Sequence, residues 1–196
     1  EDLLSHADVA LYRAKSEGRG TFRFFTDAMD ADVRRRVALD AEIRNALEKD
    51  QLFLLYQPQV DLEMGRIVGV EALVRWRLPN GRVVTPAEFI PAAERNGLIV
   101  PLGRWVISEA CRQAKAWRDA GLPPVVMAVN LSALQFKTPL ELEHDIAAAL
   151  AANAMPPELL ELELTETVLM EASREHSDAL LRLRKLGLRL AIDDFG

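Results

Sequence analysis

The chain is 196 residues long, which allows one ordinary domain or one and a half. Hydrophobic residues make up 49% of it and charged residues 28%, a balance typical of globular rather than disordered proteins. The formal net charge of −6 argues against a protein that holds a nucleic-acid polymer through a general basic field. A small anionic ligand could still bind in a locally basic pocket.

Cysteine and histidine usage narrows the chemistry further. Cys111 is the only cysteine, so the sequence allows neither an internal disulfide nor a cysteine zinc cluster. The three histidines lie far apart without H-E-x-x-H spacing, which disfavours a histidine zinc site. The sequence has no apolar run of about eighteen residues and no basic-then-apolar leader. We therefore expect a cytoplasmic domain, with any membrane attachment of the full-length protein made through domains outside this chain.

The first fifty residues are expected to form two helices joined by a short extended run. Residues 2–16 carry apolar side chains at helical spacing, and glycines at 18 and 20 end that helix. Residues 21–25 are β-prone, and a charged helix follows from about 28 to 49. Because the chain begins inside a helix and stops on an apolar strand, we expect it to be a piece of a longer protein.

After residue 50, predicted strands alternate with predicted helices. The strands are expected at 52–57, 67–76, 125–130, 160–165 and 188–194. The helices are expected at 86–95, 102–120, 140–152 and 173–186. The strands near 126 and 189 are almost continuously apolar, as expected of parallel strands covered on both faces. Repeated βα units of this kind favour an α/β fold, either a (β/α)₈ barrel or a doubly wound sheet.

Polar residues recur in or at the end of successive predicted strands: Glu71, Asn130, Glu163 and the pair Asp193-Asp194. In a βα barrel the carboxyl ends of the strands converge on one face, where active sites are built. An all-oxygen ligand set suits Mg²⁺ or Mn²⁺, and two adjacent aspartates can serve a metal-activated water that hydrolyses a phosphodiester. Taken singly, each residue could be a rim or capping residue. The pattern alone does not decide which nearby glutamate, Glu161, Glu163 or Glu166, binds metal.

Six short segments stand in a characteristic order: Tyr56-Gln57-Pro58, Glu71-Ala72-Leu73-Val74-Arg75-Trp76, Pro86-Ala87-Glu88-Phe89-Ile90-Pro91, Val129-Asn130-Leu131-Ser132, Glu163-Leu164-Thr165-Glu166-Thr167 and Asp193-Asp194-Phe195-Gly196. Together they resemble the motifs of EAL-domain cyclic-di-GMP phosphodiesterases, from about residue 40 to the end. Residues 6–20 resemble the tail of a GGDEF diguanylate-cyclase domain. The catalytic GGDEF loop itself is absent from the sequence, so no cyclase activity is implied.

The resemblance implies a modified, TIM-like (β/α)₈ barrel whose first strand runs antiparallel to the others. It implies a GGDEF-domain tail at 1–27, a linker helix at 28–49 and an EAL domain at 50–196. The barrel would be truncated after about five strands, short of the family's catalytic lysine and a later glutamate. We therefore expect this fragment alone to be inactive.

The resemblance also assigns a metal site and its catalytic residues. The cations, Mg²⁺ or Mn²⁺, would be held by Glu71, Asn130, Glu163, Asp193 and Asp194. Asp194 would be shared between metal and water. Glu166 would tie the loop after its strand to the metal site.

The substrate implied by the resemblance is cyclic-di-GMP, opened to linear pGpG in bacterial second-messenger signalling. Gln57 and Arg75 would contact the dinucleotide, Arg75 through a phosphate, and Leu73 would pack near a base. A homodimer is expected by the same resemblance. Two alternatives stay open: a catalytically silent receptor that binds cyclic-di-GMP without cutting it, and a scaffold that signals only through protein contacts.

Overall fold

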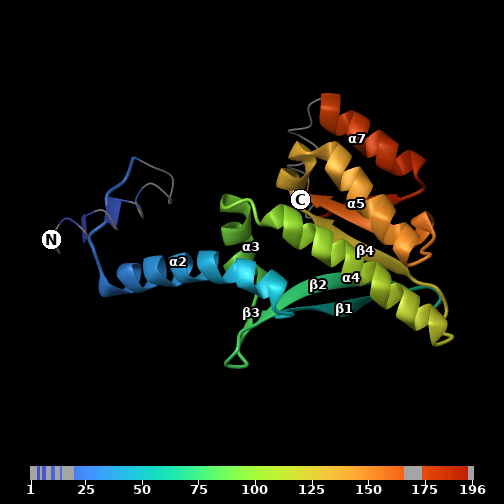
Figure 1. The fold of residues 1–196 in the computed structure, drawn as a ribbon, viewed down its shortest axis with the longest axis horizontal. Helices are drawn as coiled ribbons and strands as arrows, with labels where there is room; N and C mark the ends of the chain where they lie inside the picture. The colour runs from blue at the N-terminus through green and yellow to red at the C-terminus, as the bar shows by residue number, and fades with distance from the viewer. Residues whose placement is uncertain are drawn as a thin grey trace. The chain divides into compact units, whose positions relative to one another are not determined.

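The fold was analysed in a computed structural model that describes residues 20–165 and 174–193, together with residues 4, 6, 7, 10, 11 and 14 (Figure 1). Side chains are described for all of these except residues 30, 32–41, 165, 174–176 and 193. The chain divides into two compact units, Glu1–Asn45 and Ala46–Gly196. Each unit is described below by itself.

The first unit is mainly helical. The described residues between 4 and 14 are helical, in agreement with the helix expected at 2–16. Helix α2, Asp27–Glu48, confirms the predicted charged helix and runs into the first residues of the second unit. Residues 21–26 have no regular secondary structure, so the prediction of a short strand at 21–25 is wrong. Phe22 and Phe24 are 73% and 80% exposed, and the described residues offer this run no partner strand.

The second unit is built on a mixed sheet. Among the described residues its strand order is β1-β2-β4-β5-β6, with the short β3 paired to β2. Strand β1 runs antiparallel to β2, whereas β2, β4, β5 and β6 run parallel to one another, as the resemblance implies for the first strand. The bounds are β1 Leu52–Asp61, β2 Arg66–Arg77, β3 Val83–Val84, β4 Val126–Leu131, β5 Leu160–Thr165 and β6 Arg189–Asp193.

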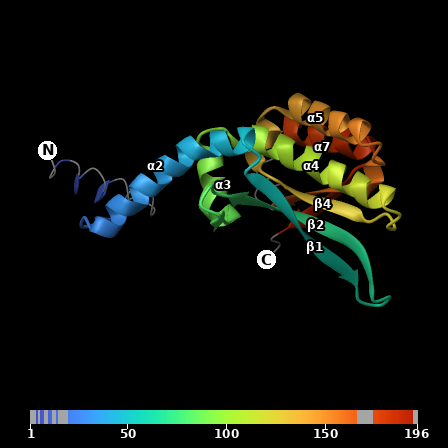
Figure 2. The ribbon, with the colours of Figure 1, turned by 60° about the horizontal axis from the view of Figure 1, so that its bottom comes forward.

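Helices connect the parallel strands and lie on one side of the sheet. Figures 1 and 2 show α4, α5 and α7 side by side over that face, while α3 lies near the end of β2. No helix among the described residues is both long and apolar enough to cross a membrane. The bounds are α3 Pro86–Arg95, α4 Ile99–Asp119, the 3₁₀ turn η1 Ala133–Lys137, α5 Pro139–Ala152, the 3₁₀ turn η2 Pro157–Leu159 and α7 Arg174–Lys185.

The core lies between the sheet and these helices. Side chains alternate between the two faces of a strand, and in β4 and β5 the positions that face the helices are apolar and buried. Each such aliphatic side chain contributes about 1.5–3 kcal/mol when it is fully buried. The alternate positions line the opposite, open face, which none of the described helices covers (Figure 2). The helix-facing residues include Val70, Ala72, Met127, Val129, Leu131, Leu160, Leu162 and Leu164.

Candidate active site

The parallel register brings three of the predicted metal ligands to the open face of the sheet. Glu71 of β2 lies opposite Ala128 of β4, and Asn130 of β4 lies opposite Glu163 of β5. Residues two apart on a strand share a face, so Ala128 and Asn130 point to the same side. Glu71, Asn130 and Glu163 therefore lie on one face, on three neighbouring strands.

Two of these side chains touch directly. The Nδ2 amide group of Asn130 donates a hydrogen bond of 2.7 Å to Oε1 of Glu71, across a sequence separation of 59 residues. Oε2 of Glu163 is buried, with an exposed area below 1 Å². Within the described part of the chain, no group of three or more His, Cys, Asp or Glu side chains is arranged to hold a metal. The described side chains of the predicted ligand set are two carboxylates and one amide.

The remaining predicted ligands belong to the end of β6. Ala191 lies opposite Glu163, and Asp193, two residues further along β6, lies opposite Thr165. The backbone of Asp193 therefore reaches the same edge of the sheet as the other predicted ligands. The side chain of Asp193 and the whole of Asp194 and Glu166 lie outside the described residues.

The predicted substrate-binding residues follow Glu71 along the same face. Gln57 of β1 lies directly opposite Glu71 in the antiparallel pair. Leu73 and Arg75 are two and four residues beyond Glu71 on β2, so both lie on the same face as Glu71. The half-buried Arg75 donates from Nη1 to the Val74 carbonyl at 2.8 Å, which fixes how its guanidinium group lies. The register thus places an arginine and an amide on the face that carries the carboxylates.

Tyr56, in the same motif as Gln57, has a structural role. Its neighbour across the β1–β2 pair is the buried Ala72, so it points to the helices rather than to the open face. Its ring packs edge-on against Trp117 of α4, with 4.8 Å between ring centroids. Burial, and secondly the nearby Glu109 carboxylate, raise the pKa of Tyr56 well above its usual value. Tyr56 therefore stays protonated, and its ring is part of the packing between the sheet and α4.

A pocket of about 250 Å³ opens at the end of β4, beside residues 72–74 of β2. Its walls come from both strands, from α3 and α4 and from the start of η1, and they are mostly apolar. Two polar groups inside it, Glu94 and Ser132, are hydrogen bonded to each other. The residues that define its character are Leu73, Ile90, Glu94, Val106, Asn130 and Ser132.

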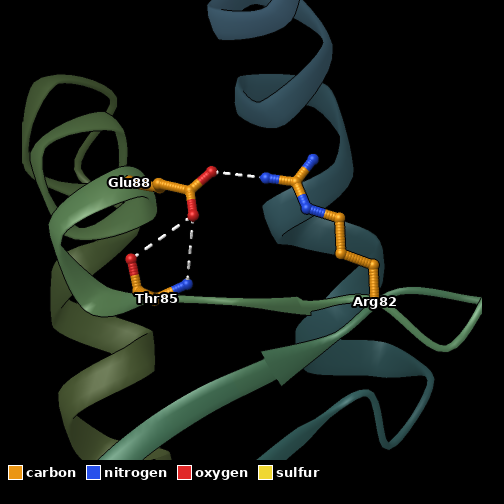
Figure 3. Close-up of polar contacts among 3 residues, drawn as sticks. All are labelled: Arg82, Thr85 and Glu88. Carbon is orange, nitrogen blue, oxygen red and sulfur yellow. Dashed lines mark hydrogen bonds and ion pairs between the residues drawn. The ribbon is translucent and has the colours of Figure 1, made fainter.

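Helix α3, which forms one wall of this pocket, is fixed at its first turn by Glu88 (Figure 3). Oε1 of Glu88 accepts from the hydroxyl and the backbone N–H of Thr85 at 3.3 and 3.5 Å. Its other oxygen pairs with Arg82 at 2.6 Å. A glutamate at the third helical position that reaches back to the N-cap residue satisfies backbone donors that would otherwise lack partners. Glu88 of the Pro86–Pro91 motif is therefore a capping residue.

Glu94 and Ser132 were not predicted as site residues from the sequence. The Glu94–Ser132 contact joins residues 38 apart, and no periodic pattern announces such a pair. One signal was present: Ser132 and Gln135 form an S-x-x-Q capping box at the start of η1. The capping box predicts a turn after Asn130, but it does not indicate that Ser132 contacts Glu94 on α3.

The model of a known protein family matches most of this chain. The EAL domain family matches residues 40–196. The chain belongs to the EAL domain family.

Relatives of this EAL domain include proteins named as enzymes of cyclic-di-GMP. The chain is 42% identical over 195 residues to the bifunctional diguanylate cyclase/cyclic di-GMP phosphodiesterase MucR of Pseudomonas aeruginosa, covering 100% of this chain and 28% of MucR. It is 40% identical over 196 residues to the cyclic di-GMP phosphodiesterase PdeR of Escherichia coli, covering 99% and 29%. The chain thus spans between a quarter and a third of the length of these relatives.

Solved EAL structures share the fold. The structure of the PaMucR phosphodiesterase in complex with c-di-GMP has a TM-score of 0.76 and 43% identity, over 81% of this chain and 64% of that one. The FimX EAL domain from Pseudomonas aeruginosa, bound to c-di-GMP, has a TM-score of 0.72 and 29% identity, over 81% and 62%. The mixed sheet with its helices is therefore an EAL-domain fold.

Proposed function

We propose that this chain is part of a phosphodiesterase that hydrolyses one phosphodiester bond of cyclic-di-GMP with water and releases linear pGpG. The observation that carries the proposal is the meeting of Glu71, Asn130 and Glu163 on the open face of the sheet, on three strands. Relatives that are named as cyclic-di-GMP phosphodiesterases support the substrate.

The proposal includes a divalent cation, Mg²⁺ or Mn²⁺, held by Glu71, Asn130 and Glu163 together with Asp193 and Asp194. The described donors fit such an ion, because carboxylate and amide oxygens are the ligands it prefers. Glu163, whose Oε2 is buried, adds a second carboxylate to this set. When bound, the cation would lower the pKa of a water molecule and neutralise phosphate charge.

The chain's own residues would orient the dinucleotide along β1 and β2. Arg75 lies four residues beyond Glu71 on the same face, where its guanidinium group suits a phosphate. Gln57, opposite Glu71, offers a donor and an acceptor to the same ligand. Leu73 is part of the wall of the 250 Å³ pocket, which would take a base against its apolar side chains. The proposed role of Glu166 is to tie the loop after β5 to the metal ligands.

The proposal extends to the surrounding architecture. We propose that the described sheet is the first part of a modified (β/α)₈ barrel, with its open face as the barrel interior. The likeness to an EAL structure of which this chain covers 64% supports this arrangement. A GGDEF tail at 1–27, a linker at 28–49 and a homodimer are further parts of the proposal and rest on the resemblance.

A receptor that binds cyclic-di-GMP without cutting it is the second candidate. It draws on the same c-di-GMP-bound EAL structures, because those complexes show binding and not turnover. The described site does not separate the two candidates, since both need the dinucleotide to sit on the same face. Turnover does separate them.

The test uses the protein encoded by the complete reading frame that contains this chain. Glu71→Gln should lower hydrolysis of cyclic-di-GMP by about 100-fold or more, because it replaces a charged ligand with a neutral one. Glu63→Gln, the same change at an exposed site in the β1–β2 turn, is the matched control and should retain full activity. EDTA should stop turnover and added Mn²⁺ should restore it.

Two results would contradict the proposal. Unchanged turnover in Glu71→Gln would remove the metal assignment. Tight binding of cyclic-di-GMP to the unsubstituted protein, with no pGpG released at any Mn²⁺ concentration, would replace the enzyme with the receptor.

A further inference from the structure

Asn130 has to be held in place by its backbone, because its side chain is exposed on the open face. Its Nδ2 donates to Glu71, but no packed apolar neighbours enclose an exposed side chain. The residue that follows, Leu131, is 4% exposed and points into the helix-facing core. The next residue, Ser132, is where the chain leaves β4.

The side chain and the backbone N–H of Ser132 make three hydrogen bonds at this exit. Its hydroxyl donates to Oε1 of Glu94 at 2.7 Å and accepts from the backbone N–H of Leu134 at 3.3 Å. Its own backbone N–H donates to Oε1 of Gln135 at 3.1 Å. Donor and acceptor groups of one residue are thus tied both to helix α3 and to the η1 turn. The bond to Glu94 is the shortest of the three and is charge-assisted, which makes it the strongest kind.

The partners of Ser132 are themselves anchored. Glu94 lies in the last turn of α3, whose first turn is fixed by Glu88. Gln135 is 4% exposed and packs against Gly103 of α4, where a Cβ atom would lie only 2.1 Å from Nε2 of Gln135. The exit of β4 is therefore attached to two helices that both belong to the packed core.

We propose that Ser132 and Glu94 are positioning residues that hold the end of β4, and with it Asn130, in register beside Glu71. Neither residue is a ligand of the cation in this proposal. They act on the metal site through two residues of backbone, and they set its affinity for the cation. The inference rests on the proposed function, because it needs a divalent cation at Glu71 and Asn130.

The test measures Mn²⁺ binding by calorimetry or electron paramagnetic resonance, without nucleotide, in the protein encoded by the complete reading frame. Ser132→Ala should weaken Mn²⁺ binding by about 10- to 100-fold, the usual cost of removing a residue that orients a metal ligand. Ser132→Thr keeps the hydroxyl and should restore most of the affinity. At saturating Mn²⁺, the kcat of Ser132→Ala should recover, because the ligands themselves remain.

Glu94 provides the matched pair of variants. Glu94→Met removes the acceptor and should weaken Mn²⁺ binding as much as Ser132→Ala does. The double variant should lose no more than either single variant, since both break one bond. Glu94→Gln keeps an acceptor for the Ser132 hydroxyl and lacks the charge, so its Mn²⁺ affinity should stay within about threefold of the unsubstituted protein.

Each contrary result has one meaning. Unchanged Mn²⁺ affinity in a folded Ser132→Ala would overturn the positioning role and leave the proposed function intact. A loss of 10-fold or more in Glu94→Gln would also overturn it, because the carboxylate charge would then act directly on the cation or the ligand. An unsubstituted protein that binds no Mn²⁺ would overturn both proposals. Glu94→Gln decides the matter even where Ser132→Ala does not fold, since it leaves the Ser132 cap of η1 in place.

Discussion

The side chain of Gln135 leaves little room for a Cβ atom at Gly103 of α4. The Cα of Gly103 faces the buried amide of Gln135, which occupies the space of a Cβ atom. Gly103→Ala should therefore lower the free energy of unfolding by about 1–3 kcal/mol, as overpacking of a dense core does. Ser108→Ala, on the exposed side of the same helix, is the control and should change it by less than about 0.5 kcal/mol. Urea unfolding followed by tryptophan fluorescence measures both.

A second residue, Cys111, makes the free energy of unfolding depend on pH in the alkaline range. Burial raises the pKa of the Cys111 thiol to about 11, against an ordinary value of 9.0. Below about pH 8 the thiol is protonated in both states. Between about pH 9 and 11 the unfolded chain releases the proton while the folded chain keeps it, so the free energy of unfolding falls as pH rises.

The expected fall is on the order of 1 to 3 kcal/mol across this window. Cys111→Ala should remove that part of the slope, as measured by urea midpoints at pH 8 and pH 10.5. Tyr56, whose pKa is also raised by burial, should keep some slope in the variant. An identical slope with and without the thiol would contradict the assignment.

At the site, the sequence predicted which residues come together better than how they are held. Glu71, Asn130 and Glu163 were identified from polar residues in apolar strands, and the register places all three on one face. The pattern left open which of Glu161, Glu163 and Glu166 binds metal. The register places Glu163 level with Asn130 and Glu161 level with Ala128. Ser132 and Glu94 could not be paired from the sequence, since side-chain contacts between distant elements leave no periodic trace.

At the scale of elements, strand β5 shows what the apolar pattern determines. Leu162 is fully buried between the sheet and the helices. Leu162→Ala should cost about 2–5 kcal/mol through lost contacts and a cavity. The same substitution at Leu140, which is 72% exposed at the start of α5, should cost far less. Amide hydrogen exchange in β5 measures the difference, and equal effects would show that β5 is not part of the core.

Element types were predicted well and their limits less well, for physical reasons. Strand β1 extends to Asp61, past the predicted end at 57, because the β1–β2 ladder tolerates Pro58 on a strand paired on one side only among the described residues. Strand β3 was missed because two residues carry no period. The apolar β4 and β6 patterns predicted cover on both faces, whereas the described helices cover one. An apolar pattern indicates that a face is buried, but it does not indicate whether helices or other strands bury it.

At the scale of the whole molecule, ligand binding should stabilise one unit and not the other. The proposed site lies entirely within Ala46–Gly196. Cyclic-di-GMP kept at about 100 times its dissociation constant should add about 2.7 kcal/mol to the stability of that unit. Exchange of the slowest β2 and β4 amides should then slow by up to about 100-fold, while amides of residues 27–45 should exchange as before.

The exchange experiment detects binding and does not require turnover, so the same prediction holds for an enzyme and for a receptor. Equal protection of both units would place the ligand elsewhere or couple the units more tightly than their separate cores imply. A lack of protection throughout would leave only the scaffold interpretation.

The hydrogen bond between Asn130 and Glu71 spans 59 residues of chain, and this separation governs when the site can exist during synthesis. A ribosome that adds about 5–20 residues per second needs roughly 3 to 12 seconds to make the second partner after the first. Throughout that interval the nascent chain has a lone carboxylate and no site. A ligand therefore cannot act at the proposed site before both β2 and β4 have been made. From that point, burial of the apolar side chains on the opposite face favours their pairing whether or not a ligand is present.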